Sequence, residues 1–443
     1  MKFNKYLLLL AFFAGNWQVS PAKKAAPSDS VTLSYFKKNI EQYEKSVMGY
    51  PGQGTPLKIS QLDQSAKRIW ALWKKANTDL SELPEPIMAK PELKAYPVHQ
   101  WQMKAEDPMP FYYFSKEDQP STGYPLFLNL HGSGPKIAEF NATIGWSLRY
   151  KDAPAIYFIP QIPNERRYRW WFKPEQYAWE KLFRLAMISG KVDANKIYVM
   201  GISEGGYGSQ RLGAFYADYL AGAGPMAGGE PLRNAPVLNY RNIAFSFQTG
   251  ENDNGFGRNK LTNRAKVVFD SLQRVYKTGF THKIELQAGK GHGIDYTKTT
   301  PYLIQHVRNP QPAALSWVLF PMDGRYRNGF YNISIDKALG LKEGEELDRA
   351  VFDIQMDKSN NTINLEVKLQ DGEGLKSAAV KQGEISIFLS PKLMDLSKKV
   401  KLMYKGKVVF NAKVKLSDAV LAESCALFGD PERLFPAKIK LIL

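Results

Sequence analysis

The chain has 443 residues, of which 44% are hydrophobic and 13% aromatic, with a formal net charge of +17 and a single cysteine. This length exceeds one ordinary core and predicts two or three domains, and the apolar content excludes a disordered chain. The lone Cys425 excludes an intramolecular disulfide and a cysteine-rich zinc site, so we expect it to be a buried thiol in a helix.

The N-terminus has the pattern of an export signal. Two lysines in the first five residues precede an apolar run over 6–14, and Ser20-Pro21-Ala22 supplies small residues for cleavage. We therefore expect residues 1–22 to be a signal peptide and the protein to be secreted or periplasmic. The apolar run is too short for a stable membrane anchor, and export argues against a nucleic-acid partner.

The positive charge is unevenly distributed, because most of the excess precedes Pro310. A basic surface favours anionic partners, and acidic polysaccharides are the class compatible with export. Solubility alone is the simpler interpretation of the same charge.

Hydrophobic periodicity divides the rest of the chain into three parts. Residues 23–95 predict a helical extension, which a proline-rich stretch at 83–86 interrupts. Over 96–309, strands alternate with helices, which predicts an α/β domain with a mostly parallel sheet covered on both faces. Over 310–443, short strands with turn signals predict a β-sandwich-like accessory domain with one helix, Asp418–Leu427.

The predicted strands of the α/β part are Val98–Met103, Phe111–Phe114, Leu126–Leu130, Ala155–Ile159, Ile197–Met200, Ala244–Gln248 and Ile284–Gln287. Its predicted helices include Pro174–Ile188 and Arg211–Tyr219. The predicted strands of the C-terminal part, all taken as antiparallel, are Leu315–Phe320, Gly329–Ile335, Val351–Met356, Thr362–Leu369, Ile385–Leu389, Val400–Tyr404 and Ala437–Leu443.

The strongest chemical signal is a G-x-S-x-G sequence, Gly201-Ile202-Ser203-Glu204-Gly205, between a predicted strand and a helical pattern. A serine nucleophile at such a strand-to-helix turn needs glycines two residues away on each side, because strand and helix approach closely there. In this setting we predict that Ser203 is a catalytic nucleophile.

A serine hydroxyl needs a base, which an acid orients in turn. Candidate groups follow the ends of two later predicted strands. His292 lies in a Gly-rich loop after Ile284–Gln287, and Glu251 and Asp253 follow Ala244–Gln248. The order serine, acid, histidine is the one expected. We predict His292 as base and Asp253 as acid, with Glu251 as the alternative acid.

Acyl transfer also needs hydrogen-bond donors for the oxyanion. The predicted strand Leu126–Leu130 runs into His131-Gly132-Ser133-Gly134, whose backbone amides are suitable donors. We predict an oxyanion hole from the amides of Ser133 and Glu204, with Gly134 as the alternative to Ser133, and a structural role for His131.

An arginine- and tryptophan-rich segment over 164–171 follows the predicted strand Ala155–Ile159, on the side expected to hold the site. Aromatic rings stack on sugar faces and arginines grip carboxylates in a bidentate geometry. Candidate substrate-binding residues are Arg166, Arg167, Arg169, Trp170 and Trp171. Core packing of a tryptophan and solvation of the arginines is the alternative.

From about Val98 to Val307, these motifs resemble the α/β-hydrolase superfamily. The chain is similar in general character to secreted bacterial esterases, among them carbohydrate esterases such as pectin methylesterases, and to prolyl-oligopeptidase-like hydrolases. The resemblance implies an α/β-hydrolase fold and hydrolysis through an acyl-enzyme. Prolyl oligopeptidases usually carry a long N-terminal propeller, whereas only about 95 residues precede the hydrolase region here.

The expected function is therefore a secreted serine esterase that removes methyl, acetyl or feruloyl groups from a polysaccharide, with an acidic one such as pectin as the leading class. A serine peptidase and a non-catalytic glycan-binding protein are the alternatives. We expect no cofactor and no metal, because the five histidines lack metal-ligand spacing. The oligomeric state and the role of the C-terminal domain are left open.

Overall fold

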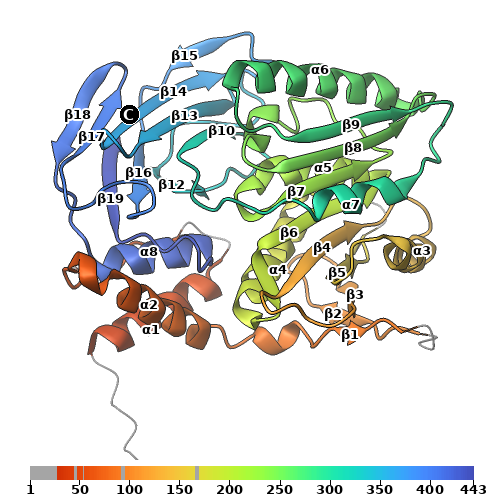
Figure 1. Ribbon diagram of the computed structural model, residues 1–443, viewed down its shortest axis with the longest axis horizontal. Coiled ribbons are helices and arrows are strands. Elements are labelled where there is room, and N and C mark those ends of the chain that lie inside the picture. The colour runs from red at the N-terminus through yellow and green to blue at the C-terminus, as the bar shows by residue number, and fades with distance from the viewer. Residues whose placement is uncertain (1–26, 44–46, 53, 91–94, 165–168) are drawn as a thin grey trace, which may run out of the picture.

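The computed structural model describes residues 27–443 apart from 44–46, 53, 91–94 and 165–168 (Figure 1). The predicted signal peptide thus lies outside the described residues. In the described part, no helix is both long and apolar enough to cross a bilayer.

The central element is a nine-stranded sheet with strand order β1-β3-β5-β4-β6-β7-β8-β9, in which β2 pairs only with β3. All pairs from β5 to β9 are parallel, and β3 is antiparallel to both β2 and β5. This confirms the predicted mostly parallel sheet. The strands are β1 (Ile87–Met88), β2 (His99–Trp101), β3 (Met109–Lys116), β4 (Tyr124–Leu130), β5 (Ala155–Pro160), β6 (Val192–Ile202), β7 (Gly222–Met226), β8 (Ala244–Gly250) and β9 (His282–Gln287).

Strand β7 was not predicted, because Gly-Ala-Gly-Pro-Met contains no β-branched or aromatic residue. Its glycines have a packing reason. A β-carbon at Gly224 would lie 2.5 Å from Cγ2 of Thr299 and 2.9 Å from Cδ1 of Leu303, both on the helix that covers this strand. The glycines that make the β7 sequence untypical of a strand thus allow this helix to pack close to it.

Helices cover both faces of this sheet (Figure 1). Alternate side chains of β4 enter different cores: Leu126 and Leu128 share one with α4, α5 and α6, and Phe127 shares the other with α3 and α7. In the second core, stacked rings run across four strands, with centroids 4.8–5.5 Å apart. The helices are α3 (Lys136–Arg149), α4 (Lys173–Ser189), α5 (Glu204–Phe215), α6 (Arg258–Tyr276) and α7 (Thr299–Leu303).

The C-terminal part contains two further sheets. One has the order β10-β13-β14-β17-β18 with β15 on β14, and the other has the order β11-β12-β16-β19. Trp317 of the first sheet stacks on Phe330 of the second at 5.3 Å. The strands are β10 (Ala314–Leu319), β11 (Gly329–Phe330), β12 (Ile333–Lys337), β13 (Arg349–Asp357), β14 (Thr362–Gln370), β15 (Ser377–Ala379), β16 (Glu384–Leu389), β17 (Val400–Tyr404), β18 (Lys407–Ala412) and β19 (Ala437–Ile442).

Two predictions for this part were wrong. The segment predicted as one strand, Gly329–Ile335, is a hairpin of β11 and β12, because Tyr331 adopts a φ of 52° and reverses the chain. The strands are also not all antiparallel, since β14 and β17 pair in parallel. Lys405 and Gly406, both with positive φ, form a turn that leads into β18, which was not predicted.

The N-terminal helices α1 (Pro27–Glu41) and α2 (Leu62–Ala76) pack with α8 (Asp418–Phe428) near the other end of the chain (Figure 1). Arg68 of α2 donates to Asp418 of α8 at 2.9 Å. The prediction of a helical extension over 23–95 was too continuous, because Pro51, Gly52 and Gly54 lie between the two helices.

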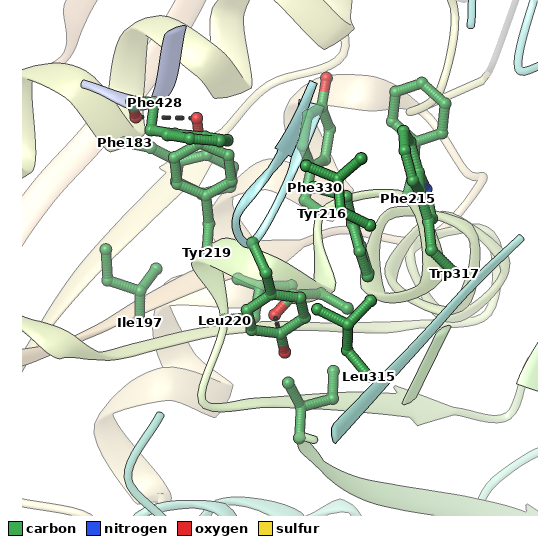
Figure 2. Close-up of a cluster of buried hydrophobic side chains, with 14 of the residues drawn as sticks. Phe183, Ile197, Phe215, Tyr216, Tyr219, Leu220, Leu315, Trp317, Phe330 and Phe428 are labelled. Atoms are coloured by element: carbon green, nitrogen blue, oxygen red, sulfur yellow. Dashed lines mark hydrogen bonds between the residues drawn. The ribbon is translucent and has the colours of Figure 1, made fainter. Parts of the chain in front are cut away.

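The α/β part and the C-terminal part share a continuous apolar contact (Figure 2). Phe215 of α5 meets Phe320 edge-on at 5.6 Å, and the Tyr219 hydroxyl donates to the Phe428 carbonyl at 2.8 Å. The C-terminal part is therefore packed against the α/β part over a buried, tightly filled surface.

Candidate active site

The G-x-S-x-G segment forms a sharp turn between β6 and α5. Ser203 has φ 56° and ψ −113°, a conformation that costs a non-glycine residue energy, and α5 starts at the next residue. A β-carbon at Gly205 would lie 2.0 Å from the Leu130 carbonyl oxygen, and one at Gly201 would lie 2.5 Å from the Gly205 oxygen. Only glycine fits at both positions, so the local sequence dictates this turn.

The turn aims Ser203 at a histidine and a carboxylate. The Ser203 hydroxyl lies 3.1 Å from Nε2 of His292, and Nδ1 of His292 lies 2.8 Å from Oδ2 of Asp253. The His292 side chain is 46% exposed, whereas that of Asp253 is 4% exposed. A solvent-accessible base backed by a buried acid is the arrangement that activates a serine for attack on a carbonyl carbon.

The two carboxylates proposed for the acid have different partners. Glu251 accepts from the backbone N–H of Gly289 at 2.9 Å and is exposed. Asp253 is the carboxylate on His292, and Glu251 ties the β8 loop to the loop that carries His292. The two lie only two residues apart, so their order in the sequence alone does not separate these roles.

Arg258, at the start of α6, was missed by sequence reasoning. It is buried, donates from Nη1 to Oδ1 of Asp253 at 2.8 Å, and donates from Nε to the Tyr207 hydroxyl at 2.9 Å. Arg258 therefore binds Oδ1 of Asp253, whereas His292 binds Oδ2. No motif marks this residue, because its role depends on the turn of α6 back toward Asp253.

The His131-Gly132 turn lies beside the nucleophile. A β-carbon at Gly132 would be 3.5 Å from Cβ of Ser203. His131 is buried; its Nε2 accepts from the Ile162 amide at 3.0 Å, and its Nδ1 donates to the Gly132 carbonyl at 2.8 Å. Both ring nitrogens are thus used in holding this turn against the β5 loop, which confirms the structural role predicted for His131.

The predicted oxyanion donors flank Ser203. The amide of Ser203 itself donates to the Met226 carbonyl at 2.9 Å and is already engaged. Glu204 supplies the first amide of α5, where the helix dipole favours negative charge, and Ser133 follows Gly132 in the adjacent turn. Both positions suit the oxyanion role, which stays a prediction.

Of the expected substrate-binding residues, the three that the structure describes do not form an open clamp. Trp170 is fully buried and donates from Nε1 to the His131 carbonyl at 3.1 Å, so it supports the turn and cannot stack on a sugar. Trp171 is also buried, with the Arg211 guanidinium 3.9 Å from its ring centroid. For both tryptophans the prediction of a stacking role was wrong, because the ring surface is already covered by protein.

Of the three arginines, Arg169 is described and is ion-paired with Glu204 at 3.1 Å. Burial raises the pKa of Glu204, and Arg169 opposes that rise. The Arg169 charge is therefore largely compensated beside the nucleophile. Arg166 and Arg167 lie outside the described residues.

Comparisons with known proteins give only distant likenesses. No family model matches the chain. A poly(3-hydroxyalkanoate) depolymerase C of Paucimonas lemoignei is 28% identical over 116 residues, which are 24% of this chain and 28% of that protein. The chain thus matches a little over a quarter of the length of this relative.

Solved structures with some likeness include a thermostable esterase (21% identity, TM-score 0.38, covering 48% of this chain and 63% of that one). A Bacillus cereus BES protein has 14% identity and a TM-score of 0.37, covering 50% of this chain and 99% of that one. A ferulic acid esterase has 15% identity and a TM-score of 0.35, covering 48% and 99%.

The fold and the arrangement of the three side chains are evident from the structure of this chain, without the comparisons. A mostly parallel sheet with helices on both faces carries a serine on a strained strand-to-helix turn. The acid and the histidine come from the loops after β8 and β9, in the order serine, acid, histidine. This arrangement can activate Ser203 for nucleophilic attack on a carbonyl carbon.

Proposed function

We propose that the protein is a serine esterase that removes ester substituents such as methyl, acetyl or feruloyl groups from a polysaccharide. The proposal rests on the hydrogen-bonded series Ser203–His292–Asp253, in which the nucleophile has a strained backbone and the base is accessible to solvent. The proposed export signal would place the enzyme where such polymers are found.

In the proposed reaction, His292 Nε2 takes the proton of the Ser203 hydroxyl while Oγ attacks the ester carbonyl carbon. Amides of Glu204 and Ser133 stabilise the oxyanion of the tetrahedral intermediate. The imidazolium then protonates the leaving alkoxide, and the alcohol departs from the acyl-enzyme. A water molecule, deprotonated by His292, attacks the acyl carbon and releases the acid with the regenerated serine.

The structure removes part of the evidence for an acidic polysaccharide as the substrate. Arg169 is paired with Glu204, and the two tryptophans are buried. The preference for a substrate such as pectin therefore depends on Arg166 and Arg167 and on the overall basic charge. We retain the acylated polysaccharide as the proposed class and treat its charge as an experimental variable.

A second candidate is a polyester depolymerase. The partial likeness to the Paucimonas depolymerase is one reason. The other is Phe256, whose ring is 86% exposed in the loop between Asp253 and Arg258 and whose φ is 52°. The Arg258 guanidinium lies 5.1 Å from the centroid of this ring, and the ring surface that is left in solvent would suit contact with an apolar chain near the triad.

The test is hydrolysis by the purified protein of a p-nitrophenyl acyl ester, acetylated xylan, methylated pectin, a feruloyl ester, poly(3-hydroxybutyrate) and a prolyl peptide. We expect turnover of the small ester and of one acylated polysaccharide, with a loss on the order of 10³-fold or more in Ser203→Ala. Hydrolysis of the polyester or the peptide alone would replace the polysaccharide proposal. Near-full activity of Ser203→Ala would remove Ser203 from the mechanism.

A further inference from the structure

A cavity of about 330 Å³ lies away from the triad, where three parts of the chain meet. Its walls come from the N-terminal helices and the segment 101–104, from α4, and from the loop around Arg325 together with the end of α8. Its volume falls in the range of small-molecule sites, which often form at domain junctions. None of Ser203, His292 and Asp253 lines it.

Charged side chains line this junction cavity as matched pairs. Arg184 binds both carboxylate oxygens of Asp79, at 2.9 and 2.7 Å. Arg325 binds Glu180 at 2.7 Å. Lys181 binds Glu82. Every member of these three pairs lines the cavity and keeps part of its surface exposed.

The remaining cations do not make the cavity an anion site. The two further cations in the lining are Arg327 and Lys104. The buried carboxylate of Asp218 neutralises Arg327. An anion would have to compete with carboxylates that already hold three of the cations. Fixed ion pairs do, however, present carboxylate acceptors and guanidinium donors in set positions, which suits a neutral ligand with many hydroxyl groups.

Aromatic rings complete the lining. Tyr43 of the N-terminal part is 47% exposed and meets Tyr177 of α4 edge-on, with ring centroids 5.3 Å apart. The Arg325 guanidinium lies 4.8 Å from the Tyr177 ring centroid and holds that ring in place. Rings that are fixed yet partly open offer flat apolar surfaces to the C–H faces of a sugar.

We propose that the junction cavity is a non-catalytic binding site for a neutral oligosaccharide. Hydroxyl groups would bind the paired charges, and one sugar face would pack on Tyr43 and Tyr177. The site would hold a polymer on the enzyme independently of turnover. It goes beyond the proposed esterase function and does not depend on it, because it shares no residue with the triad.

The experiment is isothermal titration calorimetry of full-length Ser203→Ala protein, which cannot turn the ligand over. The probes are xylohexaose, cellohexaose and mannohexaose, with hexagalacturonate as an anionic ligand of the same length. We expect at least one neutral hexasaccharide to bind more tightly than hexagalacturonate. Tighter binding of hexagalacturonate, or binding of none of the neutral probes, would overturn the proposal.

Three variants test whether the oligosaccharide binds in the junction cavity. Tyr43→Ala removes an exposed ring and should weaken binding roughly 10-fold, while Tyr43→Phe keeps the ring and should bind like the parent. Ala426→Trp, on the part of α8 that lines the cavity, should abolish binding by filling the space. Melting temperatures check that each variant is folded.

Phe256→Ala is the matched control, since Phe256 is an exposed aromatic ring beside the triad and not in the cavity. It should leave binding unchanged. If Phe256→Ala weakens binding and the two cavity variants do not, the sugar binds in the catalytic cleft and the proposal is wrong. Binding without any esterase activity would keep this proposal and remove the proposed function.

Discussion

At the scale of single residues, Arg258 fixes the orientation of the Asp253 carboxylate. Asp253 is buried, and each of its carboxylate oxygens has one cationic or imidazole donor, Arg258 on Oδ1 and His292 on Oδ2. Without Arg258, Oδ1 would lose its partner inside the protein, at a cost of about 1–3 kcal/mol, and the carboxylate could rotate away from His292. We assign Arg258 as a positioning residue.

Arg258→Met should therefore lower kcat on a small p-nitrophenyl ester by about 10- to 100-fold with little change in KM, because substrate contacts are untouched while the histidine loses its orienting partner. Arg274→Met, an exposed position near the end of the same helix, is the control and should keep full activity. A rise in KM at constant kcat would show that Arg258 acts on the substrate instead.

The alternative acid gives a second residue-scale prediction. Asp253→Asn should reduce kcat by about 10⁴-fold, since it can no longer hold the right histidine tautomer. Glu251→Gln keeps an oxygen that accepts from the Gly289 amide and should cost far less. Steady-state kinetics of the two variants side by side decides the matter, and a larger loss in Glu251→Gln would contradict the assignment.

At the scale of elements, the turn between β6 and α5 depends on two glycines. Gly205→Ala would place a methyl group 2.0 Å from the Leu130 carbonyl oxygen, which cannot move without displacing β4. We expect activity to be lost and the melting temperature to fall, with a destabilisation of about 1–3 kcal/mol or more. Circular dichroism melting and ester turnover measure both.

Gly145→Ala is the matched control for this change. Gly145 lies within α3, and a β-carbon there would have no neighbour within 4 Å. Alanine in a helix interior should stabilise by about 0.5–1 kcal/mol relative to glycine. Equal effects of the two substitutions would mean that close approach at the elbow is not what requires glycine.

At the scale of the whole molecule, a buried ion network joins the α/β part to the C-terminal part. Asp218, just after α5, binds Arg327 and Arg433, and Asp430 binds Arg433 and Arg308. Burial by itself would raise the pKa of Asp218, but the two guanidinium groups outweigh it and hold that pKa below its ordinary value. The C-terminal part is therefore expected to fold with the enzyme as one unit.

Asp218→Asn should cost about 3–5 kcal/mol of unfolding free energy, because two buried guanidinium groups lose a shared counter-charge. Glu346→Gln breaks an exposed pair with Lys376 and should cost less than about 1 kcal/mol. Denaturant unfolding measures both. Similar small values would show that the network contributes little to holding the two parts together.

The same network predicts an acid dependence. Since the pKa of Asp218 is lower in the folded than in the unfolded protein, its stabilisation is complete above the ordinary aspartate value of about 4 and is lost as pH falls through the folded value. The unfolding free energy should thus decline below about pH 4, and the decline should be smaller in Asp218→Asn. An unchanged slope in the variant would exclude Asp218 as its source.

What the sequence alone determined is what short stretches encode. The glycines around Ser203 impose one local backbone, the alternation of apolar runs with helical segments specifies a mostly parallel sheet, and Lys405-Gly406 forces a turn. What only the tertiary structure decided depends on residues far apart in the chain. The choice between Asp253 and Glu251, the role of Arg258, the burial of Trp170 and Trp171, and the parallel pairing of β14 with β17 all follow from which surfaces meet. Local backbone preferences act within a few residues, whereas burial and partner choice are set by packing between distant segments, and no short pattern carries that information.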